Sequence, residues 1–119
     1  MNMKDQFTSK VNEFLEKLGF VKNENIYELN KNFVQKKQVI IVNGQRLEQP
    51  GQSVNIKYVI TDLGDGYISN VDDSNKIDLI FYKIEVYVQD VLEGEYSSGY
   101  GFDEYDRLER EWSNILNKR

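Results

Sequence analysis

Asp78-Leu79-Ile80-Phe81-Tyr82-Lys83-Ile84-Glu85-Val86-Tyr87-Val88 is the longest run of the chain with a strict two-residue period. Side chains alternate between the two faces of a β-strand, so every second residue shares a face. One face is nearly all apolar, with Ile80, Tyr82, Ile84, Val86 and Val88. The other face grades from apolar to charged, which is typical of a half-solvated antiparallel sheet. We therefore expect a central strand whose first face packs on the core.

Apolar residues at helical spacing occur near both ends of the chain. The first stripe predicts a helix from about residue 4 to residue 18, formed by Phe7, Val11, Phe14, Leu15 and Leu18. Gly19 is expected to end this helix in a left-handed conformation, with Phe20 packed on Leu15. The second stripe predicts a C-terminal helix that follows Asp103 as N-cap and is formed by Tyr105, Leu108, Trp112, Ile115 and Leu116.

The stretch between the helices contains further strand patterns and turn signals. Strands are predicted at residues 26–29, 33–42, 54–61 and 67–71, ahead of the central strand. The four β-branched residues Val39-Ile40-Ile41-Val42 predict a strand that is covered on both faces. Reversals are predicted at Asn43-Gly44, Pro50-Gly51, residues 62–66 and residues 72–76, although residues 45–51 also fit a wide loop.

The pattern becomes ambiguous after the central strand. Within residues 89–98, Gly94 marks a bulge, a bend or another tight hairpin. Residues 97–101 are expected to be a flexible joint. The order of elements is thus an N-terminal helix, an antiparallel β-meander of four to six strands, and a C-terminal helix. We expect a single α+β domain over residues 1–119, with both helices packed on one face of the sheet.

Composition limits the chemistry that is open to the chain. The 119 residues include no cysteine and no histidine, which excludes disulfides, thiolate nucleophiles and the commonest general base. A hydrophobic fraction of 39% indicates a folded chain. The N-terminus lacks the unbroken apolar stretch of a signal peptide, and no later apolar run reaches membrane-spanning length. We expect a cytoplasmic protein with no catalytic residues, no cofactor and no metal ligands.

Charge is distributed unevenly along the chain. The net charge is +3 through residue 60 and -8 from residue 61 onward. The segment of residues 90–111 alone carries eight acidic side chains against two arginines, interspersed with aromatic residues. Carboxylates among tyrosines offer a basic partner both complementary charge and rigid anchors. The partner-binding residues predicted from this pattern are Asp90, Glu93, Glu95, Tyr96, Tyr100, Asp103, Glu104 and Asp106.

Other patterns carry weaker functional signals. Residues 62–73 resemble a calcium loop, but the required acidic ligands are out of register, so a turn is favoured over a cation site at Asp62, Asp65, Asp72 and Asp73. Gly99-Tyr100-Gly101 precedes a helix, but its acidic start disfavours a dinucleotide site. A modest basic patch on the early strands is favoured as a solvated face over a single-strand nucleic-acid site, and comprises Lys31, Lys36, Lys37, Arg46 and Lys57.

These observations predict a non-catalytic acidic interaction protein. In size, acidity and lack of catalytic groups, the chain resembles small accessory proteins of phages and mobile elements, some of which inhibit CRISPR nucleases. The resemblance is one of general character and implies inhibition of a basic nucleic-acid-handling partner by imitation of DNA, without direct binding of nucleic acid. The alternatives are a small acidic chaperone or structural adaptor that dimerises through a sheet edge or helix face, and a weak metal-dependent hydrolase.

Overall fold

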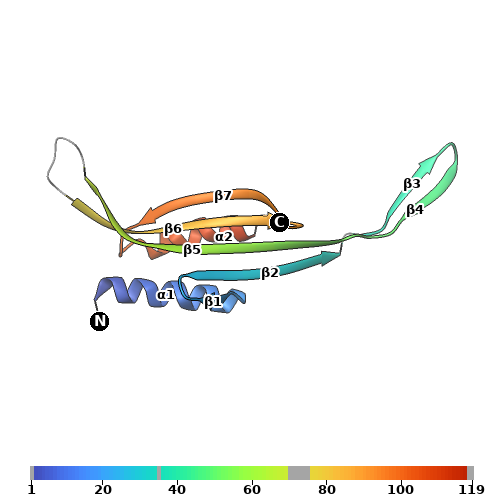
Figure 1. Cartoon of the computed structure of the whole chain (residues 1–119). Helices are drawn as coiled ribbons and strands as arrows, with labels where there is room; N and C mark the ends of the chain where they lie inside the picture. The colour runs from blue at the N-terminus through green and yellow to red at the C-terminus, as the bar shows by residue number, and fades with distance from the viewer. Residues whose placement is uncertain (1, 35, 70–75, 118–119) are drawn as a thin grey trace.

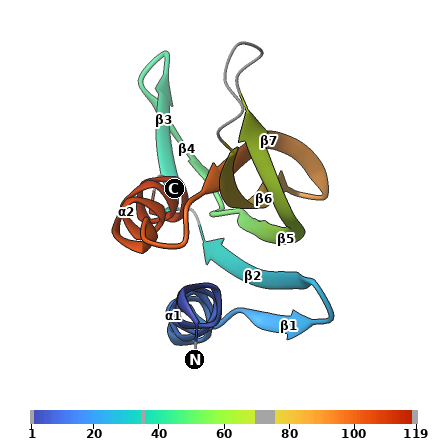
Figure 2. The same ribbon diagram turned by 90° about the vertical axis from the view of Figure 1, so that its left-hand side faces the viewer.

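A twisted antiparallel sheet with both helices on one of its faces forms the body of the molecule (Figures 1 and 2). The computed structural model describes residues 2–34, 36–69 and 76–117. The sheet has the strand order β1-β2-β5-β6-β7, with β1 (Val21–Asn23), β2 (Ile26–Val34), β5 (Ser53–Ser69), β6 (Lys76–Val88) and β7 (Val91–Tyr100). The helices are α1 (Met3–Leu18) and α2 (Tyr105–Leu116). The α+β prediction is confirmed.

Strand β6 has the central role that its alternation predicts. It pairs with β5 on one side and with β7 on the other. The predicted apolar face is buried against both helices, and the core beneath it contains Ile80, Tyr82, Ile84 and Val86 of β6, Phe7, Val11 and Leu15 of α1, and Leu108, Trp112 and Leu116 of α2. Because both helical stripes contribute to this one core, the predicted layering of two helices on one sheet face is confirmed.

Helix α1 begins and ends as its sequence indicates. The Asn2 side chain accepts a hydrogen bond from the backbone N–H of Asp5, at 2.8 Å. Gly19 has a φ of 98°, which favours glycine, and its N–H donates to the carbonyl of Glu16. The N–H of Phe20 donates to the carbonyl of Leu15, at 3.0 Å. These two bonds make the predicted Schellman stop.

Helix α2 begins differently from the prediction. Glu104, and not Asp103, occupies the cap position, and its side chain makes no capping bond to the helix. The Glu104 carboxylate instead accepts from the backbone N–H of Gly101 and from the guanidinium of Arg107. Local contacts of Glu104, with residues three positions before and after it, therefore mark the start of α2. The prediction of Asp103 as N-cap was wrong.

Strand β5 continues through the reversal predicted at residues 62–66. It pairs with β6 from Ile56 to Ser69 and contains an irregularity between Asp62 and Gly64. There the Asp62 carboxylate accepts from the N–H of Gly64, whose φ is 92°. The turn-forming residues therefore produce a bulge within a long strand, and residues 67–69 extend β5. The reversal predicted at residues 72–76 falls largely on residues 70–75, outside the described residues.

Two glycines lie against one aromatic ring on the sheet face opposite the helices, which is here called the far face. A Cβ atom added at Gly66 or at Gly99 would lie 2.6 or 2.7 Å from the ring of Phe81. Phe81 lies opposite Gly99 in the β6–β7 ladder. Close packing of this ring explains why glycine lies within a strand at each position. It also contradicts the joint predicted at residues 97–101, because residues 97–100 belong to β7.

Strands β6 and β7 are joined by a tight turn that the sequence does not reveal. Gln89 and Asp90 have φ angles of 50° and 65°, and they connect the paired residues Val88 and Val91. Two consecutive residues of positive φ are typical of a type I′ hairpin turn. Gly94 lies beside a shift in register, so the structure selects a bulge from the three alternatives at this position.

A separate two-stranded sheet projects from one end of the body and is here called the arm, residues 36–52 (Figure 1). It consists of β3 (Gln38–Val42) and β4 (Gln45–Gln49), joined by Asn43-Gly44 as predicted, with φ angles of 51° and 76°. The reversal predicted at Pro50-Gly51 was wrong, because β4 leads onward into β5. The bounds of the strands predicted at residues 26–29 and 33–42 were also wrong, because β2 runs unbroken from Ile26 to Val34 and β3 begins at Gln38.

The molecule is elongated, with principal extents of 72 × 33 × 22 Å. Its Cα radius of gyration is 19.9 Å, whereas a compact chain of this length is expected near 13–14 Å. The arm extends one end, and the outer part of the β5–β6 hairpin extends the other (Figure 1). The arm therefore lies outside the shared core.

Candidate functional site

The arm exposes apolar side chains on both of its faces. Val39, Ile41, Val42 and Leu47 are 49%, 71%, 50% and 52% exposed. Alternation places Val42 and Leu47 on one face with Ile40, since Ile40 lies opposite Leu47 in the ladder. The prediction that these residues form a strand covered on both faces is therefore wrong for the single chain.

Charged residues are confined to one face and to the base of the arm. Arg46 pairs with Glu48 at 3.4 Å and shares the second face with Val39 and Ile41. Lys36 and Lys37 precede β3 and are exposed. The face formed by Ile40, Val42 and Leu47 has only glutamines as further members, so it is here called the neutral face. A two-stranded hairpin with no core beneath it is marginally stable in water.

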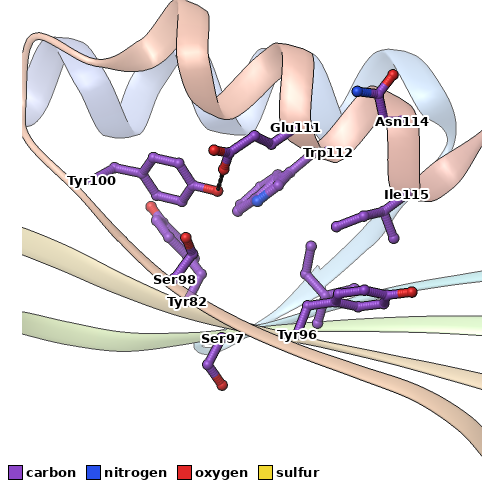
Figure 3. A pocket seen from close by; sticks show the side chains of 10 residues that line it. Tyr82, Tyr96, Ser97, Ser98, Tyr100, Glu111, Trp112, Asn114 and Ile115 are labelled. Carbon is purple, nitrogen blue, oxygen red and sulfur yellow. Dashed lines mark hydrogen bonds between the residues drawn. The ribbon is translucent and has the colours of Figure 1, made fainter.

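A groove of about 320 Å³ lies between α2 and the end of the sheet formed by β6 and β7 (Figure 3). Its walls are rich in aromatic residues and carry polar groups at the rim. The lining residues are Tyr82, Ile84, Tyr96, Ser97, Ser98, Tyr100, Glu111, Trp112, Asn114 and Ile115. We call this the α2–β7 groove. The register explains it, since Tyr96, Ser98 and Tyr100 of β7 share the sheet face that α2 covers.

Arg107 contacts two residues that line the groove, Tyr100 and Glu111, within a network of polar contacts. Its Nε donates to Glu104 at 2.9 Å, its Nη1 to Glu111 at 3.1 Å and its Nη2 to the carbonyl of Gly99 at 2.9 Å. The guanidinium lies 4.5 Å from the ring centroid of Tyr100, whose hydroxyl donates to Glu111 at 2.6 Å. This network fixes α2 against the end of β7, which gives Arg107 a structural role.

Burial, followed by the hydrogen bond to Glu111, raises the pKa of Tyr100 from 10.0 to about 12. Folding therefore favours the protonated phenol. Its contribution is complete below pH 10 and is lost as the pH rises through about 12. We expect the free energy of unfolding to fall less steeply from pH 10 to pH 12 in Tyr100→Phe, by up to about 2 kcal/mol over this range. Urea denaturation at several pH values measures the slope, and Tyr67→Phe, on an exposed tyrosine, is the control. Equal slopes for Tyr100→Phe and wild type would contradict the assignment.

The structure separates the predicted partner-binding residues into two groups. Asp90 lies in the β6–β7 turn, Glu93 and Glu95 lie exposed on β7, and Tyr96 lines the groove. Glu95 lies opposite Glu85 in the ladder, which places two carboxylates side by side on the far face. These residues form an acidic strip on the edge strand.

The second group lies at the start of α2 or in the core. Asp103 and Asp106 are exposed. Glu104 is engaged by Arg107 and by the Gly101 N–H, and these hydrogen bonds lower the pKa of its carboxyl. Tyr100 is 1% exposed, so its ring is not on the surface. Sequence reasoning did not distinguish these roles, because the Arg107 contacts join residues of β7 to residues of α2.

Neither the aspartates of residues 62–73 nor the predicted basic patch forms a cluster among the described residues. Asp65 pairs with Lys4, and the Asp62 carboxylate holds the β5 bulge. Asp72 and Asp73 lie outside the described residues. Within residues 2–34, 36–69 and 76–117, no group of three or more metal-ligating side chains is found. In the predicted basic patch, Lys31 lies over Tyr58 and Lys57 lies over Tyr87, on opposite faces of the sheet, so these two cations do not form one patch.

Comparisons with protein-family models, with curated proteins and with solved structures find no significant match. Neither described helix combines the length and the hydropathy needed to cross a membrane. The α2–β7 groove was not predicted from the sequence. The sequence indicates the groove only through the spacing of Tyr96, Ser98 and Tyr100. This spacing places three hydroxyl-bearing side chains on one face of a strand.

Proposed function

We propose that this chain is a non-catalytic protein-binding module, a structural adaptor, whose principal binding element is the arm. The observation that supports this most strongly is the exposure of Val39, Ile41, Val42 and Leu47. Their β-branched and apolar character is typical of strands that are covered on both faces. Within the described chain neither face is covered, so binding of another protein surface is the function that makes use of this sequence.

The geometry of the arm fits such a role. It projects beyond the body, where a partner can reach both of its faces and its two strand edges (Figure 1). A projecting hairpin gains main-chain hydrogen bonds and apolar contacts together when it binds. Its exposed apolar side chains require cover because contiguous apolar surface is rarely left open to water.

Photocrosslinking tests this function directly. The photoreactive residue p-benzoylphenylalanine is placed at Ile41 of the arm, and in a control at Val21 of β1, which is equally exposed at 71%. In cells that produce the protein, position 41 is expected to yield discrete protein adducts under ultraviolet light, and position 21 to yield few. Equal or absent adduct formation at the two positions would overturn the proposed role of the arm.

A second candidate function is an acidic decoy for a basic nucleic-acid-handling partner. It is favoured by the exposed acidic strip of Asp90, Glu93 and Glu95 on the edge strand β7. Charge reversal of Glu93 and Glu95 is expected to abolish such binding with no loss of stability. Glu104 is unsuitable for this test, because its contact with Arg107 is structural. Unchanged affinity of the reversed variant for a captured basic partner would exclude the decoy role.

A further inference from the structure

We propose that the arm of one copy of this chain docks in the α2–β7 groove of a second copy. This inference rests on the proposed function, because it takes the arm as the binding element and names its partner. The contact joins two different surfaces, so it is head to tail. The basic partner that the acidic segment predicts is, on this view, the chain itself.

The apolar surfaces of arm and groove are complementary in character. The neutral face of the arm presents Ile40, Val42 and Leu47, with Val42 and Leu47 about half exposed. The groove, of about 320 Å³, presents the side chain of Tyr96, which is 38% exposed, above the buried ring of Trp112. Aromatic pockets that receive aliphatic side chains are typical of the central contacts in protein interfaces.

The charges around the two surfaces are opposite. The arm carries Lys36, Lys37 and Arg46 against one acidic side chain, Glu48. The groove is formed by elements of the acidic segment of residues 90–111. Glu111 lines its α2 side and Glu93 is exposed on β7, whereas Glu95 lies on the other face of the sheet. Complementary charge brings the surfaces together and discourages arm-to-arm contact between like charges. Charge therefore selects the groove, and not another arm, as the occupied surface.

The arm and β7 also both have strand edges that are open to pairing. Strand β7 is the last strand of its sheet, so within the described part of the chain it is paired only with β6. Strands β3 and β4 are likewise paired only with each other. An arm strand added along β7 extends the sheet and satisfies main-chain groups that are otherwise left to water. A head-to-tail contact of this kind repeats from copy to copy and gives a ring or an open chain.

Complementation between two defective variants tests the contact. The arm variant carries Val42→Asp and Leu47→Asp, and the groove variant carries Asn114→Arg, at an exposed position of α2 on the groove rim. Sedimentation equilibrium from about 1 to about 100 μM is expected to show assembly of the wild type and at least tenfold weaker association of each variant alone. An equimolar mixture is expected to form a 1:1 dimer, because the arm variant keeps an intact groove and the groove variant keeps an intact arm.

The matched control carries Ile68→Asp and Ile77→Asp, an exposed cross-strand pair on the opposite hairpin. It is expected to assemble like the wild type, and circular dichroism verifies that every variant is folded. A wild type that stays monomeric to about 100 μM would overturn the inference. So would a groove variant that assembles normally, or a mixture that fails to form the dimer.

These results separate the inference from the proposed function. If position 41 crosslinks only to a different protein while the wild type remains monomeric, the arm is still a binding element and only the identity of its partner is overturned. If position 41 yields no specific adduct and the arm variant assembles like the wild type, the role of the arm itself is overturned.

Discussion

Replacing Trp112 by alanine is expected to lower the free energy of unfolding by about 3–5 kcal/mol. Trp112 is 1% exposed and lies at the junction of α2 with the sheet. Its ring is 5.0 Å from that of Tyr82 and 6.2 Å from that of Tyr100, with both pairs close to perpendicular. Removal loses these edge-to-face contacts and leaves a cavity beneath the helix. Since small domains are stable by about 5–15 kcal/mol, the loss is a large fraction of the total.

Urea denaturation followed by far-ultraviolet circular dichroism measures this effect, because the variant has no tryptophan left to report by fluorescence. The control is Ile77→Ala, at a position that is 62% exposed, for which a change within about 0.5 kcal/mol is expected. A loss below about 1 kcal/mol in Trp112→Ala would contradict the packing described for this ring. Trp112 also lines the groove, so Asn114→Arg, which leaves the core intact, is the better variant for binding.

The elements that were predicted correctly are those with a strong local period. The alternation across residues 78–88 and the two helical stripes each require burial of one face, and one sheet face satisfies all three. Gly19 and Asn43-Gly44 were also predicted correctly, because positive φ at these positions is a local property of the residues. Local chemistry was therefore sufficient for the layers of the fold.

The errors arose where pairing between distant residues overrode local turn signals. Asp62 and Gly64 are typical of a turn. Because β5 pairs with β6 on both sides of them, they form a bulge within the strand instead. Pro50-Gly51 likewise joins two strands that run onward. The turn at Gln89-Asp90 was missed because neither residue is glycine or asparagine, although both adopt positive φ.

The candidate site was predicted in composition but not in arrangement. The acidic character of residues 90–111 is visible in the sequence, whereas the division into an exposed strip and an Arg107 network depends on the packing of α2 against β7. The β-branched run of β3 was recognised as a strand that requires cover. Its place outside the shared core depends on the path of the whole hairpin.

Removing the arm is expected to leave the free energy of unfolding within about 0.5 kcal/mol of the wild type and to weaken association at least a hundredfold. In this variant Val34 is joined to Ser53, its partner at the end of the β2–β5 ladder, through a short Gly-Asn-Gly-Ser linker. Stability is retained because no residue of the arm belongs to the buried core. Association is lost because the variant lacks every apolar side chain proposed to enter the groove.

Urea denaturation, sedimentation equilibrium and small-angle X-ray scattering together check this expectation, since the radius of gyration must also fall from its elongated value. A mixture of the linker variant with the Asn114→Arg chain is the matched control. The linker variant keeps an intact groove, which is expected to accept the intact arm of the Asn114→Arg chain in a 1:1 dimer. Marked loss of stability would show that the arm is part of the folding unit, and undiminished association would place the binding surface on the body. Opposite responses in Trp112→Ala, which loses stability, and in the linker variant, which keeps it, would assign folding to the body and binding to the arm.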